Sequence, residues 1–444
     1  MPTRPTISWS DLAGSSVGLW GLGVEGAANL RRLRADGITP TLVDDHPGPS
    51  ALGELPVLAT DAGGLEALVG CEVVVKSPGI SRYRPEVVAL EAAGVAVVGG
   101  LGLWLQGVDR SRVVCITGTK GKSTTTAIVG HLLGALGVRC LVAGNIGLPP
   151  YDPEVGDDYD FWAVETSSFQ ATDLATSPPV VAVTALHPDH LDWHGDVDTY
   201  YRDKLSACSQ PGAVLTIANG DSPELRAREA SLGPTVRWVQ ADDARDGGWS
   251  RGLGLAGSHS RRNAEIARAC LQALGVEAAS DDEAMTAAAV GFTPLDSRLR
   301  TIGVLDGVAF VDDSLSTNVL SVLAALDTFA DDPVALLVGG QDRGIDYTEL
   351  GQAIDRRAHP TLVVTLPANG PRIAAAIRRA VPDAAVVDSN DLESAVDTAF
   401  AWAAPRRATV LLSPGAPSFG QFADYRDRAA AFAAALRRRS GPLT

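Results

Sequence analysis

Residues 113–123, VVCITGTKGKS, decide the fold of the middle of this chain. The apolar run Val113–Ile116 is typical of a buried strand, and residues 124–136 are typical of a helix. Small residues between the two let backbone N–H groups close around phosphate oxygens, and the start of the helix adds partial positive charge. In this arrangement Lys122 reaches the β- and γ-phosphates and Ser123 binds Mg²⁺. The segment therefore predicts a phosphate-binding loop.

One position departs from the general phosphate-loop pattern, because Ile116 stands five residues before Gly121, where a glycine is usual. A glycine-rich turn with a purely structural role is the alternative. Strand, loop, GKS and helix nevertheless occur together, and this combination favours nucleotide binding. The predicted nucleotide-binding residues of the loop are Gly118, Thr119, Lys120, Gly121, Lys122, Ser123 and Thr124.

The length and charge of the chain limit the classes of protein to which it can belong. With 444 residues it is too long for one ordinary core and suits two or three domains. The formal net charge is −16, so no overall positive field attracts nucleic acid or an anionic membrane. Five scattered cysteines without a CxxC pair indicate reduced thiols in a cytosolic protein. No signal peptide and no bilayer-spanning stretch are expected.

Apolar strand-like runs alternate with Ala/Leu-rich helical stretches, which predicts parallel α/β domains. We expect three domains, at residues 1–106, 107–295 and 296–444. The stretch from Gln240 to Ser258 is rich in Gly, Asp and Ser and predicts a loop or short hairpin. Outside the middle segment, the predicted strands are 17–20, 39–43, 72–76, 95–98, 310–311, 335–338, 362–365 and 409–412.

A second glycine-rich turn, residues 21–26, follows the first strand and has the pattern GxGxxG. Asp44 and Asp45 lie near the next strand end. The pattern alone fits NAD(P), another nucleotide diphosphate such as a UDP-sugar, or a structural turn. A UDP-sugar is favoured, because a dinucleotide would leave the phosphate-binding loop unexplained.

Glu165 ends a strand in the middle domain, where a carboxylate can bind Mg²⁺; capping the next helix is its alternative role. Three histidines follow within residues 187–194, and zinc is an alternative there. A magnesium role for one of them is more economical, and His187 and His194 are expected to be structural. Lys204, taken alone, predicts a solvated surface lysine.

Three polar turns follow strands in the last domain, at residues 312–318, 339–344 and 413–419. Ligands of parallel sheets bind beyond the carboxyl ends of the strands, so these turns predict a ligand site. Arg343 is a candidate to bind a carboxylate with two hydrogen bonds. Plain turns are the alternative for each of them.

The motifs and their order resemble the Mur ligase superfamily over nearly the whole chain, and within it the MurD branch. The resemblance rests on GTKGKS at 118–123, GNIG at 144–147, ETSSFQ at 165–170, HPDHLDWHG from 187, YRDKLS at 201–206, HSRRN at 259–263, DDSLSTN at 312–318, GGQDRG at 339–344 and LLSPGAPSFGQF at 411–422.

This resemblance implies a Rossmann-like domain that binds a UDP-substrate, a central ATPase with a parallel sheet, and a Rossmann-like C-terminal domain that brings glutamate. It implies ATP, Mg²⁺ and an acyl-phosphate. The implied catalytic residues are Lys122, Glu165, His190 and Lys204. The implied metal ligands are Ser123, Glu165, His190 and Lys204, and Lys204 would bind the metal as a carbamate. Asn263, Arg298 and Asp313 are implied for ATP. The implied substrate residues are Gly21, Gly23, Asp44, Ser77, Gly79, Asn145, Ser167, Thr317, Arg343, Ser418 and Phe419.

Some positions depart from the D-glutamate-adding members. Leu315 stands where they have a lysine, Arg343 replaces a second lysine, and the last turn is SPGAPS. Arginine and lysine bind carboxylates differently. The pattern therefore resembles the variant branch that adds L-glutamate to UDP-N-acetylmuramoyl-L-alanine. Ser260 and His46 also depart from usual family residues, an asparagine and an arginine.

Four alternatives stay open at this point: D-glutamate as substrate, another amino acid or a folate as substrate, an NAD(P)-dependent oxidoreductase, and a nucleotide-binding regulator without catalysis. For the favoured ligase the resemblance implies a cytoplasmic monomer of peptidoglycan synthesis. Its partners are the muramoyl acceptor and glutamate, with no nucleic acid and no membrane insertion.

Overall fold

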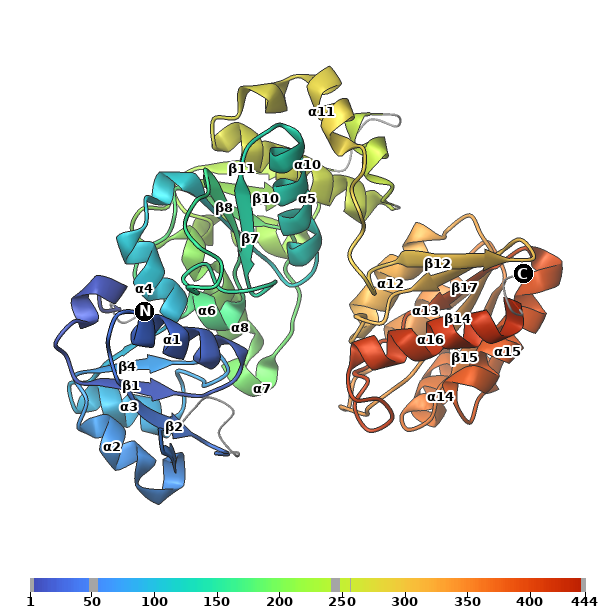
Figure 1. Ribbon diagram of the computed structural model, residues 1–444. Helices are drawn as coiled ribbons and strands as arrows, with labels where there is room; N and C mark the ends of the chain where they lie inside the picture. Colours follow the sequence, from blue (N-terminus) through green and yellow to red (C-terminus); the bar gives the residue numbers. More distant parts are fainter. Residues whose placement is uncertain (1–3, 48–54, 241–247, 256, 441–444) are drawn as a thin grey trace. The chain divides into compact units, whose positions relative to one another are not determined.

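The computed structural model describes residues 4–47, 55–240, 248–255 and 257–440. The chain forms two compact units: a first unit of Met1–Leu253 and Ser260–Phe292, and a second unit of Gly254–His259 and Thr293–Thr444. The first unit contains two sheets and the second unit contains one (Figure 1).

The first sheet is parallel throughout, with the strand order β3-β2-β1-β4-β5. Its central strand β1 leads directly into the glycine turn at residues 21–26. The elements are β1 Val17–Trp20, α1 Val24–Ala35, β2 Thr41–Asp44, β3 Val57–Ala59, α2 Leu65–Val69, β4 Val73–Lys76, α3 Pro85–Ala92, β5 Ala96–Val98 and α4 Gly100–Gly107.

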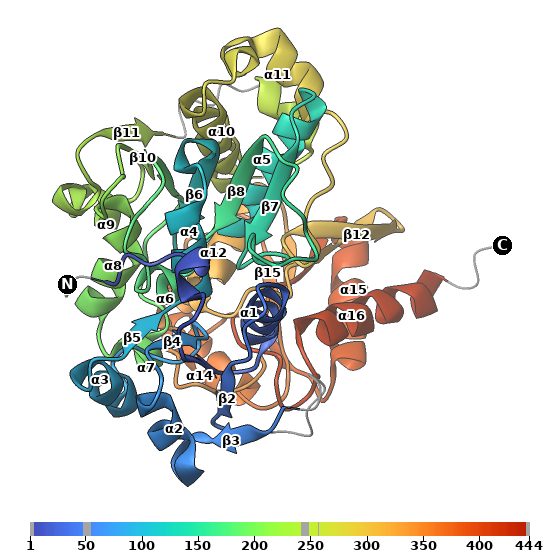
Figure 2. The same cartoon turned by 60° about the vertical axis from the view of Figure 1, so that its left-hand side comes forward.

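The second sheet is also parallel, with the order β11-β10-β9-β6-β8-β7. Strand β6 lies between β9 and β8 and is buried along its whole length, as its unbroken apolar run predicts. Helix α5 packs against β6, β7 and β8 (Figure 2). The elements are β6 Val113–Thr117, α5 Lys122–Ala135, β7 Cys140–Gly144, β8 Phe161–Glu165, α6 Ser168–Ala171, β9 Val180–Val183, α7 Leu191–His194, α8 Val197–Leu205, β10 Leu215–Asn219, α9 Pro223–Arg226, β11 Val236–Val239, α10 Ser258–Ala273 and α11 Asp282–Ala289.

The third sheet has the order β12-β13-β17-β14-β15-β16 and is parallel apart from the antiparallel pair β12–β13. Apolar side chains of α15 and α16 cover one face, and those of α12, α13 and α14 cover the other. The elements are β12 Arg300–Leu305, β13 Val308–Asp312, α12 Val319–Thr328, β14 Val334–Val338, α13 Thr348–Asp355, β15 Thr361–Thr365, α14 Gly370–Ala380, β16 Val386–Asp388, α15 Leu392–Ala403, β17 Thr409–Leu412 and α16 Tyr425–Ser440.

The predicted α/β class with three parallel-sheet domains is confirmed. The predicted strands outside the middle domain all lie within a residue or two of observed ones, but β3, β12 and β16 were missed. These three are edge strands, and much of their surface is partly or fully exposed, so they lack a long buried run. The domain boundaries at 106/107 and 295/296 stay predictions.

The predicted loop or hairpin from Gln240 to Ser258 contains a 3₁₀-helix at Trp249–Leu253, and its residues 241–247 and 256 lie outside the described residues. Other short helices are Trp9–Leu12, Thr60–Gly64, Arg110–Arg112, Ser206–Cys208, Glu229–Ser231, Glu277–Ser280 and Ala404–Arg406. Within the described parts of the chain, no helix is both long and apolar enough to cross a bilayer.

Candidate active site

The phosphate-loop sequence forms a strand, a tight loop and a helix, as predicted. Gly118 and Gly121 have φ values of 135° and 89°, in the region that favours glycine. A Cβ atom on Gly118 would lie 2.3 Å from Thr184 Oγ1, so the loop also has no room for a side chain there. Lys122 begins α5 and its Nζ donates to the Thr119 carbonyl at 3.2 Å. The loop thus presents backbone amides and a lysine at a helix N-terminus.

Asn263, predicted to contact the adenine, lies next to this loop. It sits on α10 and is buried, and a Cβ on Gly121 would lie 2.8 Å from its Oδ1. Arg298 and Asp313, the other residues predicted for ATP, belong to the second unit. Burial raises the pKa of the Asp313 carboxyl to about 7, although it accepts a hydrogen bond from Ser413 Oγ at 2.8 Å.

Lys204 is buried rather than solvated, and this corrects the prediction made from its local sequence alone. Only 2% of the residue is exposed, and Nζ donates to the Gly118 carbonyl at 3.0 Å. Burial, reinforced by the positive charge of Lys122, holds the pKa of Lys204 well below its ordinary value. A lowered pKa favours the neutral amine, which is the form that reacts with carbon dioxide to give a carbamate.

Glu165 ends β8, and its partner in the neighbouring strand β6 is Ile116, two residues before the loop. Asn145 Nδ2 donates to Glu165 Oε1 at 2.8 Å. The other oxygen, Oε2, is buried and has no hydrogen-bond partner among the described residues. A buried carboxylate oxygen left in this way suits a hard cation such as Mg²⁺.

The histidines after β9 divide into two kinds. His194 is buried between Asp203 (Nδ1 to Oδ2, 2.7 Å) and Ser168 (Nε2 to Oγ, 3.0 Å), which is the structural role expected for it. The His190 side chain is 51% exposed, and its ring lies 5.0 Å from that of Phe169. In the described parts of the chain, no three His, Cys, Asp or Glu side chains form a metal-binding group. Zinc therefore has no visible ligand set here.

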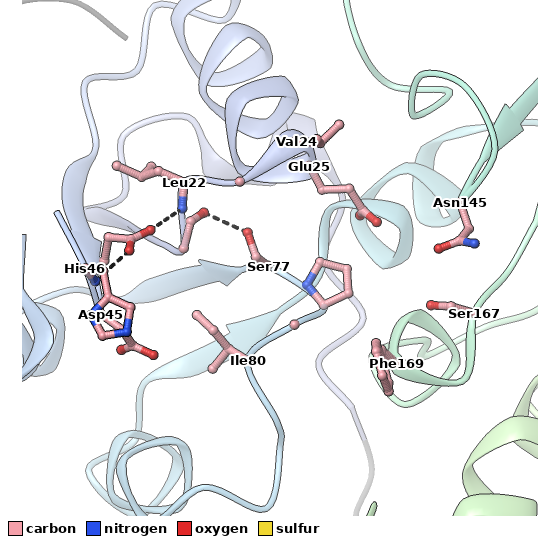
Figure 3. A pocket seen from close by; sticks show the side chains of 15 residues that line it. Leu22, Val24, Glu25, Asp45, His46, Ser77, Ile80, Asn145, Ser167 and Phe169 are labelled. Atoms are coloured by element: carbon pink, nitrogen blue, oxygen red, sulfur yellow. Dashed lines mark hydrogen bonds between the residues drawn. The ribbon is translucent and has the colours of Figure 1, made fainter. Parts of the chain in front are cut away.

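A cavity of about 490 Å³ opens beside the glycine turn of the first sheet. It is lined by all seven substrate-binding residues that were predicted within the first unit, namely Gly21, Gly23, Asp44, Ser77, Gly79, Asn145 and Ser167. Asp44 Oδ2 accepts the Leu22 amide at 2.7 Å, and Ser77 Oγ donates to the Gly21 carbonyl at 2.7 Å, so both side chains hold the turn (Figure 3). Asn145, which lines the cavity, also bonds Glu165 at the end of β8, so the cavity reaches the edge of the second sheet.

The cavity lining also includes residues that the sequence reasoning missed. Glu25 and Phe169 both line the cavity, and Gln170 Nε2 donates a hydrogen bond to Glu25 Oε1. Glu25 was an unassigned position of the GxGxxG pattern, and Phe169 and Gln170 belong to ETSSFQ. Their place inside quoted motifs was the only available signal.

In the second unit the three predicted turns follow β13, β14 and β17, which are neighbours in the sheet. The turns are bonded to each other: the Gly339 amide donates to the Pro414 carbonyl and the Gln341 amide to the Pro417 carbonyl, both at 2.9 Å. Ser418 is buried and Thr317 partly buried, whereas Arg343 and Phe419 are exposed. The structure thus brings these residues to one edge of the third sheet.

Arg428 on α16 was missed by the sequence reasoning, although it joins these turns. It is 1% exposed, and its guanidinium donates to the Ala416 carbonyl at 3.1 Å and the Ser314 carbonyl at 2.8 Å. A Cβ on Gly340 would lie 3.1 Å from the same group, so the third turn is also adjacent. Burial lowers the pKa of Arg428 to about 10.

Comparisons with known proteins agree with this geometry. Family models described as the Mur ligase middle domain and the Mur ligase MurD-like N-terminal domain match residues 116–267 and 15–99. The UDP-N-acetylmuramoyl-L-alanine–L-glutamate ligase of Xanthomonas euvesicatoria pv. vesicatoria is 39% identical, covering 96% of this chain and 95% of that protein. The protein of that name from a Micromonospora species is 37% identical, covering 97% and 98%.

Among solved structures, the UDP-N-acetylmuramate-alanine ligase MurC of Thermotoga maritima matches with a TM-score of 0.56 at 17% identity. The match covers 96% of this chain and 100% of that one. At this identity the likeness concerns the fold, and it extends over all three sheets.

Proposed function

The chain belongs to the Mur ligase family, and on this premise we propose that it joins L-glutamate to UDP-N-acetylmuramoyl-L-alanine in peptidoglycan synthesis. Its relatives of 37–39% identity that span nearly its whole length carry the name of that L-glutamate ligase. The observation that supports the proposal best is the 490 Å³ cavity, whose lining unites all the acceptor residues expected in the first unit.

Mur ligases depend on ATP, with Mg²⁺ as the typical metal. For this chain we propose both. ATP would convert the acceptor carboxylate to an acyl-phosphate, and Mg²⁺ would offset the charge of the phosphates. The residues that would hold Mg²⁺ are Ser123, Glu165 and Lys204 as its carbamate, with His190 as a further candidate. The unpartnered Oε2 of Glu165 and the burial of Lys204 support this set.

The chain's own groups would then have separable tasks. The loop amides and Lys122 hold the terminal phosphates, because both are donors at a helix N-terminus. Asn145 links the acceptor cavity to Glu165 and would position the acceptor's alanyl end. In the second unit, Thr317, Arg343, Ser418 and Phe419 are proposed to bind glutamate, with Arg298 and Asp313 serving ATP.

L-Glutamate is preferred over D-glutamate for two reasons. The named relatives are L-glutamate ligases. In addition, Leu315 provides no cation where D-glutamate-adding members have a lysine. A different arrangement of carboxylate-binding groups is therefore expected in this pocket.

One assay tests the proposal. Purified protein receives Mg²⁺, ATP and UDP-N-acetylmuramoyl-L-alanine with L- or D-glutamate in separate reactions, and ADP release and the new amide are measured. We expect product with L-glutamate and at least about tenfold less with D-glutamate. Product only with D-glutamate would reverse the stereochemical assignment, and no product with either would refute the function.

The remaining assignments are also proposals. Nucleotide-activated cell-wall precursors are made in the cytoplasm, so we place the enzyme there. A monomer is expected, since one chain contains every motif. An oxidoreductase that binds NAD(P) at residues 21–26 would leave Lys122, Glu165 and the second unit without a task.

A further inference from the structure

Glu25 lines the acceptor cavity between the glycine turn and the residues of the middle domain. It is in the first turn of α1 and lines the 490 Å³ cavity. Figure 3 shows its carboxyl directed toward Asn145 and Ser167, away from the end lined by Asp45 and His46. The proposed reaction gives this side chain no task.

One oxygen of Glu25 is held firmly. Gln170 Nε2 donates to Glu25 Oε1 at 2.8 Å. Gln170 is itself oriented by the helix cap of α6. Its Oε1 accepts a hydrogen bond from the Ser167 backbone amide at 2.8 Å, and its backbone amide donates to Ser167 Oγ at 3.1 Å. Gln170 therefore presents a donor to Glu25 Oε1. The Tyr151 hydroxyl interacts with the same carboxyl group, which also lines the cavity.

The charged groups around Glu25 leave it without a cation. The positive charge that acts on Glu25 is that of Lys76, whose Nζ is bonded to Asp173 at 2.7 Å. Asp173 and Tyr151 also face Glu25 from the segments packed against it. In the described parts of the chain, no ion pair involves Glu25. Burial raises the pKa of Glu25 to about 7, and the charge of Asp173 adds to this. The hydrogen bond from Gln170, the charge of Lys76 and the Tyr151 hydroxyl oppose it.

The proposed acceptor carries negative charge on its diphosphate and on its terminal carboxylate. An ionised Glu25 would repel these charges inside a partly enclosed cavity. A protonated Glu25 would instead donate a hydrogen bond.

We propose that Glu25 is a specificity-determining residue of the acceptor site: it binds the anionic UDP-sugar acceptor in its protonated form and donates a hydrogen bond to it from the carboxyl group. This inference rests on the proposed function, because it takes the UDP-sugar as the occupant of the cavity. Binding above neutral pH then requires the uptake of one proton by Glu25.

Calorimetric titration of UDP-N-acetylmuramoyl-L-alanine into the full chain tests this without catalysis. The titration is done at pH 6.5 and 8.5 and, near pH 8, in buffers of different ionisation enthalpy. For the wild type we expect the Kd to rise about 25-fold from pH 6.5 to 8.5, with close to one proton taken up per acceptor near pH 8.

Glu25→Gln is the decisive variant, because an amide imitates the protonated carboxyl and can still accept from Gln170. We expect it to lose the proton uptake and to bind the acceptor about 30-fold more tightly than the wild type at pH 8.5. A gain in affinity cannot come from misfolding. Proton linkage from other groups or from the ligand would persist in the variant, so the difference between the two proteins isolates Glu25.

Asp45→Asn is the matched control, since Asp45 is another carboxyl lining the cavity. Burial raises the pKa of Asp45, but hydrogen bonds from Arg84 and Thr60 outweigh this and hold it below its ordinary value. Proton uptake should therefore persist in Asp45→Asn. Equal uptake by the wild type and Glu25→Gln would overturn the inference. Absence of binding by both at either pH would overturn the proposed function and the inference with it.

Discussion

Single residues in this protein owe their chemistry to what surrounds them. Lys204 and Arg428 are both cations in the sequence, yet one is 2% and the other 1% exposed. Burial disfavours the charged form of each. For Lys204, burial near the phosphate loop favours the neutral amine. For Arg428, burial leaves the guanidinium enclosed by three turns. The two side chains therefore lead to different predictions.

Replacement of Lys204 tests the proposed carbamate. Lys204→Arg and Lys204→Ala should each lower the rate of ADP release by at least about 10³-fold, because neither side chain can become an anionic ligand. ¹³C-NMR of wild-type protein in ¹³C-bicarbonate should show a carbamate signal that both variants lack. Arg202→Ala, two residues earlier on α8 at an exposed position, is the control. Wild-type rates in Lys204→Ala would remove this lysine from the mechanism.

Replacement of Arg428 tests whether it positions the glutamate turns. Arg428→Lys keeps a cation but loses the planar guanidinium, whose two terminal nitrogens each bond one of the Ala416 and Ser314 carbonyls. We expect the KM for glutamate to rise at least about tenfold, with the acceptor KM changed less than about twofold, and a loss of about 2 kcal/mol in unfolding free energy. Exposed Arg426→Lys serves as the control. An equal rise in both KM values would indicate a general loss of structure instead.

At the scale of elements, a buried ionic group joins the first two sheets. Lys76 at the end of β4 donates to Asp173 just after α6, at 2.7 Å, and Arg82 Nε donates to the other Asp173 oxygen at 2.5 Å. Lys76 and Asp173 are almost fully enclosed. The group therefore links the first sheet to the segment that follows α6.

Asp173→Asn should lower the unfolding free energy of the first unit by about 3–5 kcal/mol at pH 7, because two cations lose their anion. Lys76→Met with Asp173→Asn should cost less than the sum of the two single changes, as a double-mutant cycle by chemical denaturation will measure. The exposed pair Arg32–Asp36 provides the control, and Asp36→Asn should cost under about 0.5 kcal/mol. Additive costs would contradict the coupling.

The same aspartate predicts a pH dependence. Burial raises the pKa of Asp173, but Lys76 and Arg82 outweigh this and hold it below its ordinary value. Its contribution to stability is therefore present above about pH 4, the pKa of an unfolded aspartate, and is lost as the pH falls further. Acid unfolding should be less steep in Asp173→Asn than in the wild type. Identical acid transitions would contradict the assignment.

For the whole molecule, the proposed residues are divided between two compact units. Lys122 and Lys204 belong to the first unit, whereas Arg343 and Ser418 belong to the second. An acyl-phosphate is lost if water reaches it before the amine does. The proposed reaction therefore needs both units to act on one pair of substrates.

Small-angle scattering tests this requirement. Addition of a non-hydrolysable ATP analogue together with the acceptor should reduce the radius of gyration, because domain closure excludes water from such sites. The analogue alone is the control and should have a smaller effect. An unchanged radius with both ligands would count against closure.

The sequence by itself determined the parts that depend on neighbouring residues. An unbroken apolar run predicted β6, and the glycines at 118 and 121 predicted a loop whose φ values only glycine adopts easily. Recognition of the family then assigned the acceptor residues, and the seven in the first unit line one cavity. The roles themselves stay predictions, but their common location followed from the order of the motifs.

Only the tertiary structure decided the state of the titratable side chains. Lys204 bonds a carbonyl 86 residues away and Arg428 one 114 residues away, while Glu25 meets Gln170 across 145 residues. Desolvation and Coulomb energy depend on every group within several ångströms, wherever that group lies in the chain. A local pattern contains no information about such neighbours, so the buried lysine, the enclosed arginine and the raised pKa of Glu25 were visible only in the fold.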